Sequence, residues 1–140
     1  MELIKVNPNK IDHVRNLFVI LARKKFNISH ICLPTYQEHK KFVQNHPYRF
    51  WYFILADQKY IGVIYLTFEN VIGINTTISS KETYIEAISA VIKLHKPLEE
   101  IKSIRNKSFI INVNPKNKIL IEAIKTLGLH HIQNTYVVKN

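Results

Sequence analysis

Histidine side chains are the groups of this sequence most suited to metal binding, and their spacing decides whether they can converge on one ion. His130 and His131 adjoin each other at the start of an expected strand, where neighbouring side chains point to opposite faces. His39 and His46 can share a helix face, but no third ligand lies near them in the sequence. A structural or catalytic metal needs three or four convergent ligands, so we expect no metal site.

The cysteine and the aromatic run have structural explanations. Cys32 lies between Ile31 and Leu33, a setting typical of a small buried hydrophobe rather than of a nucleophile. A single cysteine also excludes a disulfide framework. The aromatic residues of 48–53 could stack on bases, but in a strand they alternate between the two faces of a sheet. We therefore expect them in the core.

A helix start near Ser79 is a candidate anion site. The free N–H groups and the dipole of a helix start attract an anion, and Lys81 and Thr83 would assist. Ser79 and Glu82 also have the spacing of a capping box, in which their side chains satisfy the free N–H groups themselves. The sequence leaves both interpretations open.

Alternating strands and helices must position these groups. Residues that are apolar or β-branched, bounded by turn residues, predict strands over Glu2–Val6, Phe50–Ala56, Tyr60–Phe68, Val71–Ile78, Ser108–Val113 and Thr135–Lys139. The three from Phe50 to Ile78 are joined by short turns and predict an antiparallel meander. We expect Ser108–Val113 to lie parallel to Val71–Ile78, because a helix connects them.

Four helices are expected from apolar residues at helical spacing and from capping residues. The first follows Asn9, and the second is opened by Thr35 with Glu38 completing a capping box. The third begins near Ser80 and ends before Pro97. The last begins at Asn114 with Pro115 and ends at Gly128. The segment Leu98–Asn106 is expected to be a short polar helix or irregular.

Length and composition indicate one domain over residues 1–140, with 46% hydrophobic and 21% charged residues. The net charge is +10, mostly from lysines spread along the chain, and no basic stripe or nucleic-acid-binding module is present. We therefore expect no nucleic-acid partner. No apolar run approaches the roughly 20 residues of a membrane span, and the N-terminus lacks a secretory apolar region. These features favour a cytoplasmic protein without a membrane partner.

The order of strands and helices resembles that of the GCN5-related N-acetyltransferases. The segment Val113–Asn117, the helix after it and Leu127-Gly128-Leu129 are similar to the family's "V-x-P-x-N … LGF" segment, and Tyr136 falls where a late-strand tyrosine is common. The resemblance implies a single-domain α/β (α+β) acyl-CoA N-acyltransferase-like fold, with a mixed central sheet and helices on both faces. It further implies acetyl-CoA as acyl donor and a primary amine of a small molecule as acceptor, and it leaves a homodimer open.

A second likeness concerns the segment Glu38–Phe42. Together with the strands over 51–54 and 61–64, it is similar to the branch of the family that acts on amino sugars. This likeness implies an amino sugar as acceptor and makes His39 a candidate catalytic residue. The alternative for His39 is a partly buried polar residue on an amphipathic helix.

The coenzyme-binding loop departs from the family pattern. The family binds the pyrophosphate through an "R/Q-x-x-G-x-G" loop, whereas the stretch Ser79–Glu86 contains no glycine. Lys81 takes the basic position, and Tyr84 and Glu86 stand at the glycine positions. The resemblance still assigns coenzyme contacts to residues of this region and of the matched motif: Ile78, whose backbone N–H would polarise the thioester carbonyl, Lys81, Thr83, Tyr84, Ile85 and Asn117.

The proton-transfer groups also depart from the family pattern. The family's thiolate-protonating tyrosine corresponds to Ile124, so Tyr136 is the candidate substitute. Glu69, beside the central strand, is the candidate general base. Their alternatives are core packing for Tyr136 and a solvated turn residue for Glu69. The sequence therefore supports two functions: an acetyltransferase whose pantetheine arm enters a gap after Val71–Ile78, or a non-catalytic binding or interaction domain that has lost the coenzyme loop.

Overall fold

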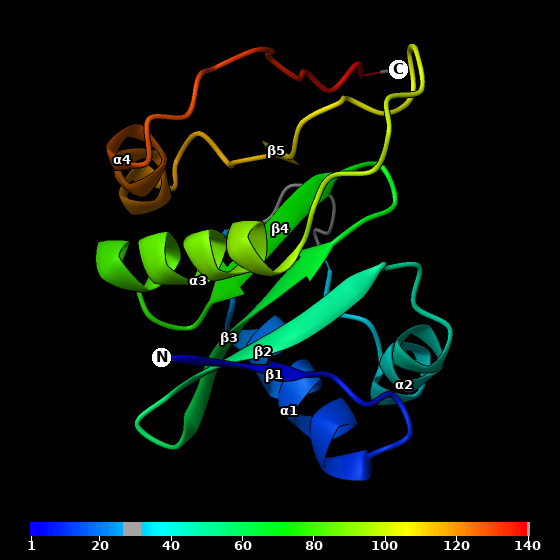
Figure 1. The fold of residues 1–140 in the computed structure, drawn as a ribbon. Coiled ribbons are helices and arrows are strands. Elements are labelled where there is room, and N and C mark those ends of the chain that lie inside the picture. The colour runs from blue at the N-terminus through cyan, green and yellow to red at the C-terminus, as the bar shows by residue number, and fades with distance from the viewer. Residues whose placement is uncertain (27–31, 140) are drawn as a thin grey trace.

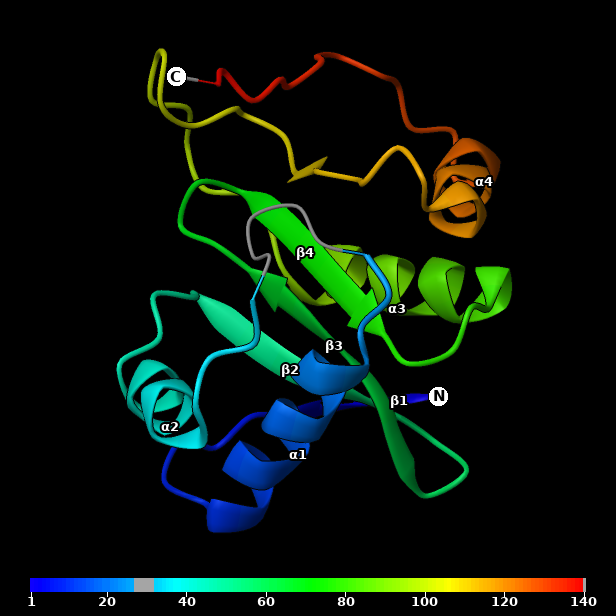
Figure 2. The same cartoon turned by 180° about the vertical axis from the view of Figure 1, so that it is seen from behind.

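A five-stranded mixed sheet runs through the centre of the molecule, and helices lie on both of its faces (Figure 1, Figure 2). The computed structural model describes residues 1–26 and 32–139. The elements follow in the order β1 (Glu2–Lys5), α1 (Ile11–Arg23), α2 (Tyr36–Gln44), β2 (Phe50–Ala56), β3 (Lys59–Leu66), β4 (Val71–Thr76), α3 (Lys81–Leu94), β5 (Ile110–Ile111) and α4 (Lys118–Thr126).

The strands lie in the order β1-β2-β3-β4-β5. The first four pair antiparallel, which confirms the expected meander, and β5 pairs parallel to β4 after the crossover through α3, as predicted. The expected strand Ser108–Val113 is shorter than predicted, because only Ile110 and Ile111 pair with β4. This short pairing matters for the site described below.

Each face of the sheet has its own hydrophobic core. Helices α1 and α2 cover Trp51, Phe53 and Val63, and Figure 2 shows α1 in front of this face. Helices α3 and α4 pack against Ile54 and Ile64 on the other side. The aromatic run therefore alternates into both cores, as expected from strand periodicity.

Asn70 attaches the segment before β5 to the β3–β4 turn. Its side chain is fully buried, and its Nδ2 donates to the carbonyls of Leu98 and Asn106, both at 2.8 Å. Its Oδ1 accepts from the Leu98 N–H, also at 2.8 Å. The segment Leu98–Asn106 is irregular, with a single bridge between Ile101 and Arg105. One amide thus replaces the backbone hydrogen bonds that this segment lacks.

The helix starts differ from the expected ones at three positions. Lys10, not Asn9, is the N-cap of α1, and the Asn9 N–H binds the Asn7 side chain at 3.0 Å in the turn before it. Helix α3 is capped by Ser80 rather than Ser79. Asn117 caps α4, three residues after Asn114. Ser80 and Asn117 each accept a first-turn N–H, from Thr83 and Leu120, whereas Lys10 makes no side-chain cap hydrogen bond.

Two other helix boundaries are as predicted. Thr35 and Glu38 form the capping box of α2. Gly128 follows α4 with a φ of 72°, and its N–H and that of Leu129 bind the carbonyls of Lys125 and Ile124. This is a Schellman motif, in which glycine is favoured because the position needs a positive φ.

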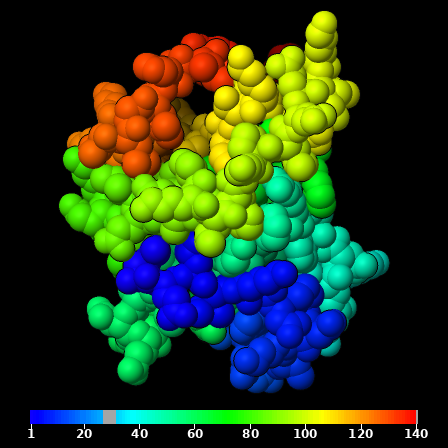
Figure 3. Space-filling view, in the orientation of Figure 1, coloured from blue at the N-terminus to red at the C-terminus, as the bar shows by residue number. Residues whose placement is uncertain are grey.

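The expected strand Thr135–Lys139 does not form. The segment after α4 carries no regular structure, and Tyr136, Val137 and Val138 are 81%, 86% and 86% exposed. Figure 3 shows an opening between this orange-red segment and the yellow residues that lead to β5. β-Branched residues favour a strand only where a face of the strand is buried, and here none is. The two-residue β5 offers too short an edge to order them.

Two further observations concern the described part of the chain. Cys32 is exposed, so the expectation of a buried cysteine is wrong; it precedes α2 in an irregular segment rather than inside an element. Within residues 1–26 and 32–139, no helix has the length and apolar character needed to cross a membrane, and no three His, Cys, Asp or Glu side chains converge on a metal site.

Candidate functional site

A cavity of about 490 Å³ lies on the sheet face that α1 and α2 cover. It extends from these helices across the middle of the sheet to the region between β4 and β5. Its walls come from six parts of the fold: Leu17, Ile20, Leu21 and Lys24 of α1 and its C-cap, Glu38, His39 and Phe42 of α2, Trp51, Val63 and Tyr65 of the sheet, residues 71–76 of β4, Tyr84 of α3, and Asn112–Asn114 with Asn117 beyond β5.

The end of the cavity is formed where β4 and β5 part. The two strands pair only at Val71 with Ile110 and at Ile72 with Ile111. Past these pairs, Gly73–Thr76 and Asn112–Asn114 both line the cavity. Two parallel strands that separate after two residue pairs leave an opening into which backbone N–H and C=O groups of the strands face. The opening therefore offers hydrogen bonds to an extended ligand.

Aromatic rings form the floor of the cavity. The Tyr48 and Tyr65 rings are stacked, with centroids 4.1 Å apart, and the Trp51 ring meets Tyr48 edge-on at 4.9 Å. Burial raises the pKa of Tyr65, and burial together with the neighbouring Tyr65 phenol raises the pKa of Tyr48 strongly. Both phenols are therefore protonated near neutral pH, and the floor is uncharged.

Trp51 has a donor without an acceptor. Its side chain is 7% exposed, and its indole Nε1 is buried with no hydrogen-bond partner in the described structure. A buried N–H left unpaired costs about 1–3 kcal/mol, so a polar atom of a bound ligand is one way to satisfy it.

His39 lies in the wall of the cavity and joins α2 to α1. Its Nε2 is 3.1 Å from the carbonyl oxygen of Val14, and because a carbonyl only accepts, Nε2 carries the proton. Burial lowers the pKa of His39, so the ring is neutral at pH 7 and Nδ1 is its basic nitrogen. The side chain is 4% exposed and packs on Phe18. These contacts match the structural interpretation, and a catalytic role stays a prediction.

Tyr84 and Asn117, two of the expected coenzyme residues, come together below the opening. The Tyr84 hydroxyl lies 3.0 Å from Thr76 Oγ1 and 3.4 Å from Asn117 Nδ2. Thr76 Oγ1 also lies 2.6 Å from the Ile78 carbonyl oxygen. The network connects the end of β4 with the starts of α3 and α4. Because the Tyr84 ring is buried in the core, it does not stand beside the start of α3, where its bulk would obstruct an anion.

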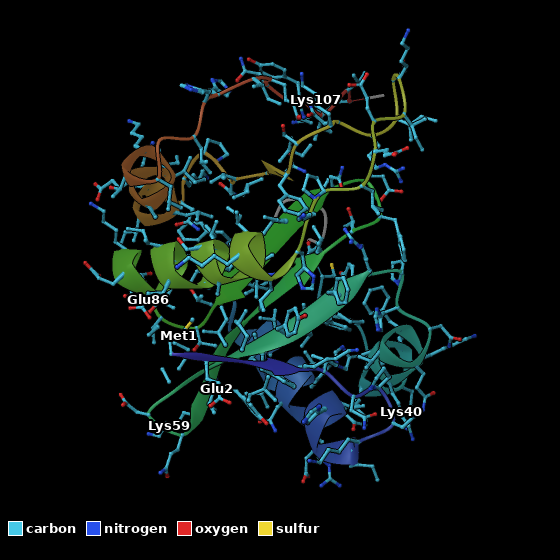
Figure 4. The ribbon with its side chains drawn as sticks, viewed as in Figure 1. Met1, Glu2, Lys40, Lys59, Glu86 and Lys107 are labelled. Carbon is cyan, nitrogen blue, oxygen red and sulfur yellow. The ribbon has the colours of Figure 1, made fainter. Side chains whose placement is uncertain are left out.

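The remaining coenzyme candidates surround the start of α3. Ser80 Oγ accepts the Thr83 N–H at 3.2 Å and leaves the N–H groups of Lys81 and Glu82 outside the cap. Ile78 is 45% exposed in the loop before the helix. Ile85 packs against the α3–α4 core. Lys81 is thus the cation of this helix start, whereas Glu86 lies on the outer surface of α3 (Figure 4).

Glu69 and Tyr136 lie away from this region. Glu69 is exposed in the β3–β4 turn, at the opposite end of β4 from Thr76, a strand length of roughly 20 Å. Tyr136 belongs to the exposed C-terminal segment. Of the expected site residues, the structure therefore places Tyr84, Asn117 and His39 in the cavity lining. Ile78, Lys81, Thr83 and Ile85 lie in or just before the first turns of α3, outside that lining, and Glu69 and Tyr136 lie elsewhere.

The sequence reasoning missed the cavity floor and its cation Lys24. One signal was available: Trp51, Tyr65 and Gly73 pair across β2, β3 and β4, so their side chains share one face of the sheet. A glycine beside two large rings marks a place where a ring crosses the backbone.

Comparisons with protein-family models, with curated proteins and with solved structures found no match to this chain.

Proposed function

We propose that this protein is an acyl-CoA-dependent N-acetyltransferase acting on a primary amine of a small molecule. The observation that carries the proposal is the parting of β4 and β5 after two residue pairs, with the cavity continuing through the opening. The finer fold assignment, an acyl-CoA N-acyltransferase-like domain, belongs to the same proposal. Its support is the element order together with the parallel placement of β5.

The residues present fit the coenzyme in part. The opening between Gly73–Thr76 and Asn112–Val113 has the backbone groups that an extended amide-containing arm requires. Lys81 and the first N–H groups of α3 would hold a phosphate. The glycines that would allow a closer approach are missing, so one cation and one helix start have to bind the pyrophosphate.

In this proposal the coenzyme supplies an activated acetyl thioester, and the chain orients the acceptor amine. The cavity floor between α1 and β4 would receive the acceptor, and backbone N–H groups near Ile78 would polarise the carbonyl. The amine must lose a proton before or during attack. His39 Nδ1 is the basic nitrogen in the cavity wall, and water is the alternative acceptor, because Glu69 lies too far away.

The second candidate is a non-catalytic binding domain. It is favoured by the Ser80 cap, which already occupies the Thr83 N–H, and by Ile124 at the position of the family's thiolate-protonating tyrosine. In that case the cavity would bind a ligand without transferring an acyl group.

A thermal-shift experiment separates the two. A ligand that binds the native state raises the melting temperature by mass action. We expect 1 mM acetyl-CoA to raise it, and 3′-phospho-ADP, which lacks the pantetheine arm, to raise it less, because the opening contacts the arm. No shift with acetyl-CoA would favour the non-catalytic domain, and equal shifts would show that the opening does not hold the arm.

A further inference from the structure

The cavity combines an apolar floor with a cation at its rim. The floor consists of the rings of Trp51, Tyr48 and Tyr65, and Leu17 and Leu21 of α1 add aliphatic wall. Such a surface gains free energy by covering an apolar or aromatic body, and gains little from the hydroxyl groups of a sugar. The floor therefore suits a ligand with an apolar or aromatic body.

The cation is Lys24, at the C-terminus of α1. Its side chain is partly buried and lines the cavity, and Lys25 lines the same rim. Burial lowers the pKa of Lys24, which indicates a charge held without full hydration. No ion pair involves Lys24 among the described residues, and the sequence of 27–31, Asn-Ile-Ser-His-Ile, contains no carboxylate.

One carboxylate, Glu38, also lines the cavity. Its Oε2 accepts the Thr35 N–H at 3.2 Å as part of the capping box of α2. Glu38 is therefore used by the helix start, and the two lysines leave the rim with an excess of positive charge. The unpartnered Trp51 Nε1 is an additional donor, independent of the lysines. The Lys24 ammonium and the Trp51 Nε1–H are both hydrogen-bond donors, so each requires an acceptor atom on the ligand.

We propose that this cavity binds an amphipathic anion, whose apolar or aromatic body lies on the Trp51–Tyr65 floor and whose carboxylate or other anionic group binds Lys24. For the reaction proposed above, the acceptor would then be an amine that also carries an anionic group, as an apolar amino acid does. That last step rests on the proposed function. The binding itself does not, because it requires no coenzyme.

Trp51 makes the binding directly measurable, since it is the single tryptophan of the chain and lies in the floor. Three probes of one size separate the contributions: 3-phenylpropanoate carries the carboxylate, phenethylamine carries the amine, and phenylalanine carries both. We expect 3-phenylpropanoate and phenylalanine to change Trp51 fluorescence in a saturable way. Phenethylamine should bind at least tenfold more weakly.

Substitution of Lys24 tests the charge. Lys24→Gln should weaken 3-phenylpropanoate binding about tenfold, as expected for loss of a charge-assisted contact, and leave phenethylamine unchanged. Lys107→Gln removes the same charge at an exposed residue that does not line the cavity, on the segment before β5 (Figure 4), and should change nothing. The proposal is wrong if no carboxylate probe saturates, if phenethylamine binds as well as 3-phenylpropanoate, or if Lys24→Gln binds like wild type. Acetyl-CoA binding, measured separately, reports on the proposed reaction whichever result is obtained.

Discussion

The Tyr65 ring lies across the backbone of β4 at Gly73, so that a Cβ at position 73 would stand 2.0 Å from Tyr65 Cζ. The two residues are paired across β3 and β4. The ring cannot tilt away freely, because its other face is stacked on Tyr48. The absence of a side chain at Gly73 therefore determines the shape of the cavity floor.

Gly73→Ala should destabilise the protein by about 1–3 kcal/mol, since the added methyl must displace a buried ring. Urea denaturation followed by circular dichroism measures the free energy of unfolding. The same substitution in a Tyr65→Leu background should cost much less, because the displaced ring is gone.

Gly128→Ala is the matched control for that experiment. Nothing lies within 4 Å of a Cβ at Gly128, but its φ is 72°. We expect Gly128→Ala to lower the free energy of unfolding by about 1 kcal/mol through backbone strain. The loss should be the same with Tyr or Leu at position 65. A Gly73→Ala cost that is equally independent of residue 65 would contradict the steric explanation.

Asn70→Gly should lower the free energy of unfolding by about 2–4 kcal/mol. Glycine keeps the φ of 63° that this turn needs but loses all three amide hydrogen bonds to Leu98 and Asn106. Hydrogen exchange measures where the loss appears: protection of Leu98 should fall more than that of β2. A loss of less than about 0.5 kcal/mol would show that the amide does not hold this segment.

The sequence predicted the elements whose residues are patterned locally. The meander, the α2 capping box and the glycine end of α4 follow from alternation, from Thr35 and Glu38, and from Gly128. The parallel β5 follows from the connecting helix. What failed depends on distant residues: whether Thr135–Lys139 forms a strand is decided by the length of β5, which no local pattern encodes.

Some residues of the candidate site were singled out from the sequence, and others were found only in the folded structure. Asn117 was expected from a matched motif and Tyr84 from its place at a glycine position of the coenzyme loop, and Asn117 Nδ2 lies 3.4 Å from the Tyr84 hydroxyl. Lys24 and Asn70 were not singled out, because a lysine after a helix and an asparagine in a turn look like ordinary surface residues. Only the folded chain brings Lys24 and Trp51 to one cavity and the Asn70 side chain to the Leu98 backbone.

Acid should destabilise the protein partly through His13. Burial, with Lys10 nearby, lowers the pKa of His13 from 6.5, and its Nδ1 accepts the Asn7 N–H at 2.8 Å. As the pH falls, His13 is therefore protonated in the unfolded state before it is protonated in the folded state. Its contribution to the free energy of unfolding is fully present above about pH 6.5 and is lost as the pH decreases toward the lowered pKa of the folded state. Urea denaturation at pH 7.5 and at pH 5.5 measures the loss.

His13→Asn should make that loss smaller, because an asparagine oxygen can accept the same N–H but does not titrate. His130→Asn, at an exposed position of the C-terminal segment, serves as the control and should leave the pH dependence unchanged. If His13→Asn loses as much stability between the two pH values as the wild type and the control do, His13 does not contribute.

Removal of residues 135–140 should change the free energy of unfolding by less than about 0.5 kcal/mol. The described side chains of this segment are exposed, and no regular element contains them. Denaturation of the shortened chain measures this. A loss of several kcal/mol would indicate that the segment does pack as a strand, which would restore Tyr136 as a site candidate.

Calorimetric titration of acetyl-CoA tests the proposed function most directly. We expect saturable binding to the wild type, binding about tenfold weaker to Lys81→Glu, whose negative charge would lie at the start of α3, and wild-type binding to Lys107→Glu, which makes the same change far from it. Absence of binding to the wild type at millimolar acetyl-CoA would contradict the acetyltransferase, and equal affinities for the wild type and Lys81→Glu would contradict the placement of the pyrophosphate.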